Sequence, residues 1–154
     1  SGVEPWLEFL RGLGFHVLGN ERISIGDTHP GGASFDLAGI HDQYAARFHP
    51  TLTPDIDAAL IGRDAERELV LMAHQPSQIA MAQGKGVGLQ LSGHTHGGQI
   101  WPFGLAARLV QPYLKGHHVH DDGTQVYVSC GTGYWGPPLR VGAPPEVASI
   151  ILTS

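Results

Sequence analysis

Ser92-Gly93-His94-Thr95-His96-Gly97-Gly98-Gln99-Ile100 follows the apolar residues 87–91 and places two histidines two positions apart, directly before a pair of glycines. In an extended backbone, residues i and i+2 project to the same side, so the pattern predicts that both imidazoles face one pocket. Neutral imidazole is the side chain that most often ligates metals in proteins. The stretch therefore predicts a metal site where a strand meets a loop, with His94 and His96 as ligands.

A third histidine occupies an equivalent position. His74 follows the apolar residues 69–73 of a buried-strand pattern that starts at Glu68, and it is followed by Gln75 and Pro76, a plausible start for a helix. A helix over residues 77–83 would then join the two strands in a β-α-β unit. The carboxyl ends of parallel strands meet at one edge of a sheet, where ligand sites are usually built. We therefore expect His74 to lie beside His94 and His96.

The remaining patterns predict one structural unit of mixed α and β. The spacing of apolar residues predicts helices over residues 5–13 and 53–61 and a partly helical loop over 101–114. Turn residues between apolar segments predict a hairpin of strands 15–18 and 21–25 through Gly19-Asn20, and a second hairpin of 118–120 and 124–129. Further strands are predicted over 35–40 and 147–152.

Composition excludes several classes of protein. The chain has 154 residues, 42% hydrophobic and 15% charged, which is typical of one globular domain. A net charge of −5, with nine scattered Lys and Arg, argues against a nucleic-acid surface. The single cysteine, Cys130, excludes an internal disulfide and is expected to be a packed small side chain. The sequence contains neither a bilayer-spanning apolar run nor a signal peptide.

Two strings carry a family resemblance. Leu-Met-Ala-His-Gln-Pro at 71–76 and Leu-Ser-Gly-His-Thr-His-Gly-Gly-Gln-Ile at 91–100 resemble the second half of a calcineurin-like metallophosphoesterase. They are most similar to the bacterial phosphodiesterases that often carry a membrane anchor, and the resemblance extends from about Trp6 to the end. It implies an α+β (mixed α/β) fold, a four-layer α/β/β/α sandwich with mixed sheets, in which residues 1–154 form the C-terminal portion of a single domain.

The resemblance also implies a chemistry. It implies hydrolysis of a phosphate ester, and more narrowly of a phosphodiester, by a water activated between two divalent metal ions (Mn, Zn or Fe). His74 and His94 would hold the second metal and His96 the first, while Gly97, Gly98 and Gln99 would border the phosphate. Arg140 is a further substrate-binding candidate because guanidinium suits phosphate geometry, although a structural arginine at the end of the sheet explains it equally. No catalytic acid or base is assigned.

Motifs that the family carries upstream are absent as a set: Asp-x-His, Gly-Asp-x-x-Asp and Gly-Asn-His-Asp/Glu. Gly26-Asp27 mimics the second of them, but no Asp stands three residues later, and its neighbours Thr28, Pro30, Gly31 and Gly32 have the composition of a turn. We therefore expect the isolated chain to be inactive and to be completed by the N-terminal half of the same protein or by a second copy. The expected substrate is a small-molecule or lipid phosphate ester, and the expected location is cytoplasmic, with any membrane association through a segment outside this chain.

Three alternatives remain open. The chain could be a non-catalytic metal-binding fragment. An amidohydrolase also uses His-x-His, but its barrel can hardly be built from 154 residues. A metallo-β-lactamase expects an aspartate where Gly98 stands. His117, His118 and His120 alternate beside an Asp-Asp-Gly turn, which is more typical of an exposed hairpin face than of a metal site; His41, Asp42 and His49 are loop residues that could lie near the pocket.

Overall fold

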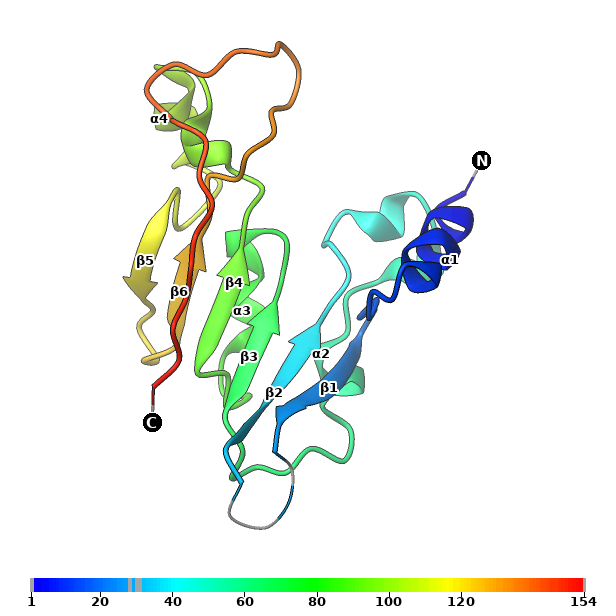
Figure 1. Cartoon of the computed structure of the whole chain (residues 1–154). Coiled ribbons are helices and arrows are strands. Elements are labelled where there is room, and N and C mark those ends of the chain that lie inside the picture. Colours follow the sequence, from blue (N-terminus) through cyan, green and yellow to red (C-terminus); the bar gives the residue numbers. More distant parts are fainter. Residues whose placement is uncertain (1, 28, 30–31, 154) are drawn as a thin grey trace.

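A single six-stranded mixed sheet forms the centre of the molecule (Figure 1) in the computed structural model, which describes residues 2–27, 29 and 32–153. The strand order is β1-β2-β3-β4-β6-β5. The strands are β1 (Glu21–Gly26), β2 (Ser34–Gly39), β3 (Leu69–Met72), β4 (Leu89–Ser92), β5 (Gly116–Val119) and β6 (Gln125–Val128). The four central strands are parallel, and the edge strands β1 and β5 are antiparallel to their neighbours. The mixed α/β class is confirmed.

The helices are short and are spread along the chain between residues 4 and 107. They are α1 (Glu4–Gly12), α2 (Ile56–Leu60), α3 (Ile79–Ala82) and α4 (Phe103–Ala107), with 3-10 turns η1 (Ala45–Arg47), η2 (Pro50–Leu52), η3 (Pro76–Gln78) and η4 (His96–Gly98). Among the described residues, no helix combines the length and apolarity that a bilayer crossing requires. The helix expected over 77–83 is present as η3 followed by α3 and ends before Gly84, whose φ is +69°.

One face of the sheet carries the core. Side chains that alternate along β2, β3 and β6, such as Ala38, Leu71 and Val126, are fully buried against α2 and α3. The opposite face is only partly covered: the C-terminal segment passes across it, and Ile150 and Leu152 help to line a groove of about 890 Å³ along the strands. The described residues thus supply one sheet and one helical layer of the four-layer sandwich that the resemblance implies.

Two predicted strands were wrong. Residues 147–152 pair with no strand of the described structure. Residues 15–18 are not a strand either, because Asn20 does not turn a hairpin. Its left-handed backbone, with φ +59°, lets the side chain bridge three distant backbone groups. Its Oδ1 accepts hydrogen bonds from the His41 and Asp55 N–H groups at 3.2 and 3.0 Å, and its Nδ2 donates to the Thr53 carbonyl at 2.8 Å.

Other local predictions were close. The helix expected from Thr53 begins at Ile56, because the Asp55 side chain accepts the Ala58 N–H at 2.9 Å and caps it. The hairpin of β5 and β6 is confirmed. Asp27 follows β1 and accepts the His29 N–H, as in an ordinary turn. Thr28, Pro30 and Gly31 of that predicted turn lie outside the described residues.

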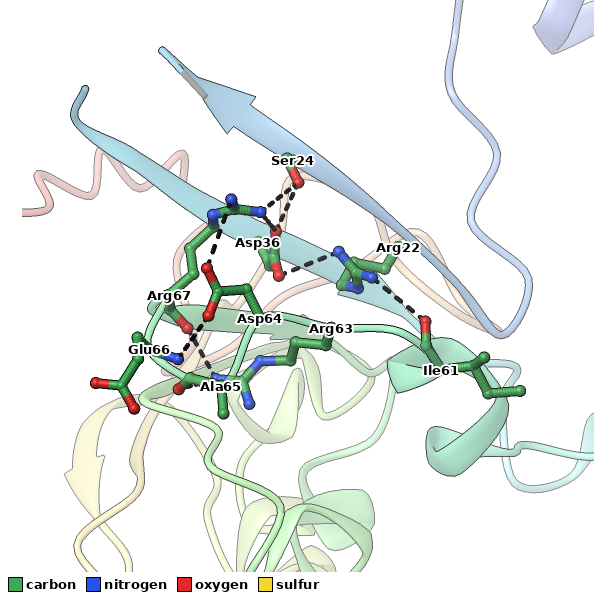
Figure 2. A network of polar contacts seen from close by, with 9 residues as sticks. All are labelled: Arg22, Ser24, Asp36, Ile61, Arg63, Asp64, Ala65, Glu66 and Arg67. Atoms are coloured by element: carbon green, nitrogen blue, oxygen red, sulfur yellow. Dashed lines mark hydrogen bonds and ion pairs between the residues drawn. The ribbon is translucent and has the colours of Figure 1, made fainter. Parts of the chain in front are cut away.

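A buried carboxylate connects the antiparallel edge to the rest of the sheet (Figure 2). Asp36 of β2 is fully buried and accepts hydrogen bonds from Ser24 Oγ at 2.7 Å, Arg22 Nη1 at 3.1 Å and Arg67 Nη1 at 3.2 Å. Burial by itself raises the pKa of Asp36, but the hydrogen bonds from Ser24 and Arg67 and the charges of both arginines outweigh it, so the pKa lies below its ordinary 3.8. The network joins β1, β2 and the segment that precedes β3.

We predict that Asp36→Asn lowers the free energy of unfolding at pH 7 by about 2–3 kcal/mol, because it leaves Arg22 and Arg67 without their counter-charge. The pKa of Asp36 is lower in the folded state, so its contribution is present above the unfolded pKa and is lost as the pH falls below about 3.8. Urea unfolding should therefore show the two proteins converging at low pH. Asp57→Asn, which removes an exposed partner of Lys85, is the control, and an equal loss in both variants would contradict the argument.

Candidate metal centre

The β3–α3–β4 unit brings two of the predicted histidines to one edge of the sheet. His74 and His94 each stand two residues beyond the end of their strand. The ladder continues past both strand ends, since the Gly93 N–H donates to the His74 carbonyl at 3.0 Å. In this register, the residues that follow β3 and β4 lie side by side at the same edge of the sheet. The backbone pairing of β3 and β4 therefore sets the separation of the two imidazoles.

The imidazoles of His74 and His94 face each other. His74 Nε2 lies 3.2 Å from His94 Nδ1, and the ring centroids are 5.0 Å apart. Two nitrogens bound to one ion at about 2.0–2.1 Å are roughly 2.8–3.0 Å apart in octahedral geometry and roughly 3.3–3.4 Å apart in tetrahedral geometry. The observed 3.2 Å lies between these values and fits two ligands of one divalent cation. Burial lowers the pKa of His94, His74 lowers it further, and Asp42 opposes the shift. A neutral imidazole has the free lone pair that metal ligation needs.

His96 lies apart from that pair. It helps to line the same cavity, of about 780 Å³, as His74 and His94. Its Nδ1 is 3.3 Å from Arg140 Nη2, and both burial and the arginine charge lower the pKa of His96. Across residues 2–27, 29 and 32–153, no three His, Cys, Asp or Glu side chains are grouped to hold one metal ion. The structure thus brings together His74 and His94, whereas His96 lines the same cavity without joining them in one ligand group.

The backbone of the motif is not extended, so the geometric reason given for its two histidines was wrong. His94 and His96 have φ of +67° and +50°, and Gln99 follows with +43°. Left-handed backbone costs a non-glycine residue about 1–3 kcal/mol, and such strain tends to gather at functional sites. The histidines line one cavity because the chain turns sharply at each of them, not because of strand alternation.

The paired glycines permit these turns. Gly97 and Gly98 have φ of +64° and +87°, in the region that favours glycine. A Cβ on Gly97 would lie 2.6 Å from Cys130 Sγ, and a Cβ on Gly98 would lie 2.6 Å from the Gly104 Cα. Gly98 and Gln99 line the cavity, whereas Gly97 packs against the β6 side of the site.

A buried glutamine fixes the backbone beside His74. The Gln75 side chain is 1% exposed and uses both of its polar atoms. Its Nε2 donates to both carboxylate oxygens of Asp42, at 3.1 and 2.9 Å, and its Oε1 accepts from Gln43 at 2.7 Å and from Gln111 at 3.2 Å. Gln75 thereby joins the loops that follow β2 and α4 to the end of β3. Sequence reasoning missed this role, because nothing in one sequence distinguishes a buried amide from an exposed one.

Arg140 holds the loops around the site together through hydrogen bonds to their backbone. Its guanidinium donates to the carbonyls of Cys130 at 2.8 Å, Gly131 at 3.1 Å, Ala143 at 3.2 Å and His96 at 3.3 Å. Donors that are engaged by carbonyls in this way are not free to bind phosphate. Between the two interpretations that the sequence left open for Arg140, the structure favours the structural one.

The other candidate residues lie in local contacts. Tyr113 stacks on His118, with centroids 4.6 Å apart, and its hydroxyl contacts His120 Nδ1 at 2.8 Å. His117 pairs with Gln125 on the exposed side of the hairpin, and His49 contacts Thr51. Cys130 is buried, and burial, followed by Glu146, raises the pKa of its thiol. A high pKa makes a thiol a poor nucleophile, in agreement with the packing role expected for Cys130.

Three relatives illustrate what this chain is similar to. An uncharacterized metallophosphoesterase of Helicobacter pylori (strain J99) is 46% identical over 152 residues, which are 98% of this chain and 39% of the relative. A transmembrane protein with metallophosphoesterase domain of Danio rerio is 36% identical over 155 residues, 99% of this chain and 36% of the relative. An uncharacterized metallophosphoesterase of Aquifex aeolicus is 32% identical over 152 residues, 98% of this chain and 56% of the relative.

No family model matches the chain, and no solved structure matches it. The similarity to the named relatives nevertheless extends over almost every residue, including both histidine motifs, while the chain spans about 39% of the length of the Helicobacter relative. Over 98% of its length, the chain is 46% identical to proteins named metallophosphoesterases, so its sequence is similar to about two fifths of such a protein.

Proposed function

We propose that this chain supplies histidine ligands to a dinuclear metal centre that hydrolyses a phosphodiester. The observation that supports this most directly is the approach of His74 Nε2 to His94 Nδ1 at 3.2 Å, on the ends of two adjacent parallel strands. His74 and His94 would hold one divalent ion, and His96, across the same cavity, would hold the other. Manganese, zinc and iron all accept imidazole ligands.

Divalent ions in such a site polarise the phosphoryl oxygens and make a bound water acidic enough to attack. The residues of this chain would position the metal ligands and the phosphate. The β3–β4 ladder and the Gln75 hydrogen bonds hold His74 in place, and the left-handed turns present His94 and His96 to the cavity. The backbone of Gly98 and Gln99 borders the space where the phosphate would lie.

The proposal includes a further part of the protein, which we call the completing part, that supplies the missing metal ligands. Two converging imidazoles are too few ligands for a catalytic metal, and one face of the sheet is covered only by the C-terminal segment. The remaining length of a metallophosphoesterase, on the same chain or on a separate one, would supply carboxylate ligands and cover that face; a second copy of this chain is the alternative. The Danio relative is named a transmembrane protein, and a membrane-spanning segment of that kind would lie in such a part.

The first prediction concerns metal affinity. His74→Ala and His94→Ala should each weaken Zn²⁺ or Mn²⁺ binding at least about tenfold, measured by isothermal titration calorimetry, because each removes one of two converging ligands. His117→Ala is the matched control, since His117 lies on the exposed hairpin and contacts Gln125. Equal binding by the wild type and by both site variants would refute the assignment.

The second prediction concerns turnover. The 154 residues alone should hydrolyse bis(p-nitrophenyl) phosphate negligibly, because the described residues contain no group of three side chains that could hold even one ion. With the completing part added, hydrolysis should appear, and EDTA, His94→Ala or His96→Ala should abolish it. Chelator-insensitive turnover by these 154 residues alone would show that the chemistry does not depend on this metal centre.

A non-catalytic metal-binding role is the second candidate. It is favoured by the absence of a three-ligand cluster among the described residues. The two candidates differ in one outcome, namely whether the completed protein hydrolyses a phosphodiester in a metal-dependent way. Metal binding without any hydrolysis under those conditions would favour the non-catalytic role.

A further inference from the structure

One wall of the histidine cavity is almost wholly apolar. The cavity holds about 780 Å³, and its lining includes His74, His94 and His96. Most of the remaining lining is apolar: Ile100, Phe103, Ala106, Ala107 and Val110 from α4 and the residues beside it, and Trp135 and Pro137 from a later loop. We call these apolar residues the α4 wall. Phe103 and Trp135 meet edge to face across this wall, with centroids 6.3 Å apart, yet both stay more than half exposed, at 61% and 57%. Large apolar side chains left open beside a candidate catalytic site suit an apolar ligand group.

The polar side chains in this cavity, apart from the histidines, are already occupied. Thr95 Oγ1 donates to the Leu114 carbonyl at 2.6 Å. The Gln99 amide donates to the Trp135 carbonyl at 2.8 Å and accepts the Trp135 N–H at 2.9 Å. Gln111 accepts the Ser77 N–H and donates to Gln75. A cavity that recognises a nucleobase or a sugar uses free donors and acceptors, whereas the nitrogen and oxygen of both amides are already bonded within the protein.

The charged residues around this cavity favour a negatively charged ligand. Residues 100–116 and 131–142, which form this lobe, contain Arg108, Lys115 and Arg140 and no Asp or Glu, although the whole chain has a net charge of −5. The apolar wall also continues outward along α4 to Leu105 and Leu109, which are 57% and 86% exposed. A cationic, apolar lobe is complementary to an anionic amphiphile.

We propose that the substrate is a phosphate ester that carries an acyl chain, with its phosphate at the histidines and its chain along the α4 wall. This inference rests on the proposed function for the position of the phosphate. The aliphatic side chains around Phe103 and the engaged amides favour an acyl chain over a nucleoside as the apolar group. Each CH₂ group removed from water strengthens binding about fourfold, so even a short chain gives a measurable preference.

The test compares three phosphodiesters of equal charge, by isothermal titration calorimetry with the full chain and Mn²⁺. They are dihexanoylphosphatidylglycerol below its critical micelle concentration, the deacylated glycerophosphoglycerol, and the dinucleotide TpT. The acylated ligand should bind at least about tenfold more tightly than the other two. Equal affinities, or tightest binding of TpT, would overturn the inference.

Substitutions test whether the α4 wall causes the preference for the acylated ligand. Phe103→Ser and Val110→Ser should each reduce the acyl preference severalfold, and both positions are exposed enough to leave the fold intact. Phe48→Ser, at an 86% exposed position outside the cavity, is the matched control and should keep the preference. An equal reduction in Phe48→Ser would overturn the assignment to the α4 wall.

Hydrolysis of the same ligands, measured with the completing part added, separates this inference from the function on which it rests. Tight binding of the acylated ligand without any hydrolysis would support the acyl site and contradict the proposed activity. Hydrolysis of all three ligands with equal affinities would support the activity and contradict the acyl site.

Discussion

The parallel pairing of β3 with β4 is the constraint on which the rest of this site depends. Its register places the ends of both strands at one level, and its last hydrogen bond, from Gly93 to the His74 carbonyl, lies between the two histidines. A shift of one residue would turn one imidazole to the other face of the sheet. The core side chains of β3 and β4 oppose such a shift, because Leu71 and Gln90 are fully buried. Packing in the core therefore fixes the separation of the two histidines.

Around that ladder the chain accepts local strain and buries polar groups. His94, His96 and Gln99 hold left-handed backbone, and the Gln75 amide is buried with all of its hydrogen bonds made. Such features lower stability unless neighbouring contacts compensate. The burial of Asp36 between Arg22 and Arg67 makes a comparable connection at the antiparallel edge. The molecule thus combines a conventional sheet with two polar networks that hold its loops.

The sequence predicted the β-α-β unit well because the apolar runs before His74 and His94 are strong and local. It also predicted that these two histidines would lie together, which follows from the topology alone. It failed where distant residues decide the structure. Asn20 was assigned to a hairpin because Gly-Asn favours one, whereas its side chain actually bridges His41, Thr53 and Asp55. Residues 147–152 were predicted as a strand but have no pairing partner among the described residues.

The central claim is that His74 and His94 bind one ion because the β3–β4 ladder brings them together. Anomalous diffraction from crystals soaked with zinc tests it most directly. The account predicts a zinc peak about 2.0–2.2 Å from both His74 Nε2 and His94 Nδ1. Zinc bound instead at the His118 and His120 hairpin, with no peak between His74 and His94, would contradict it.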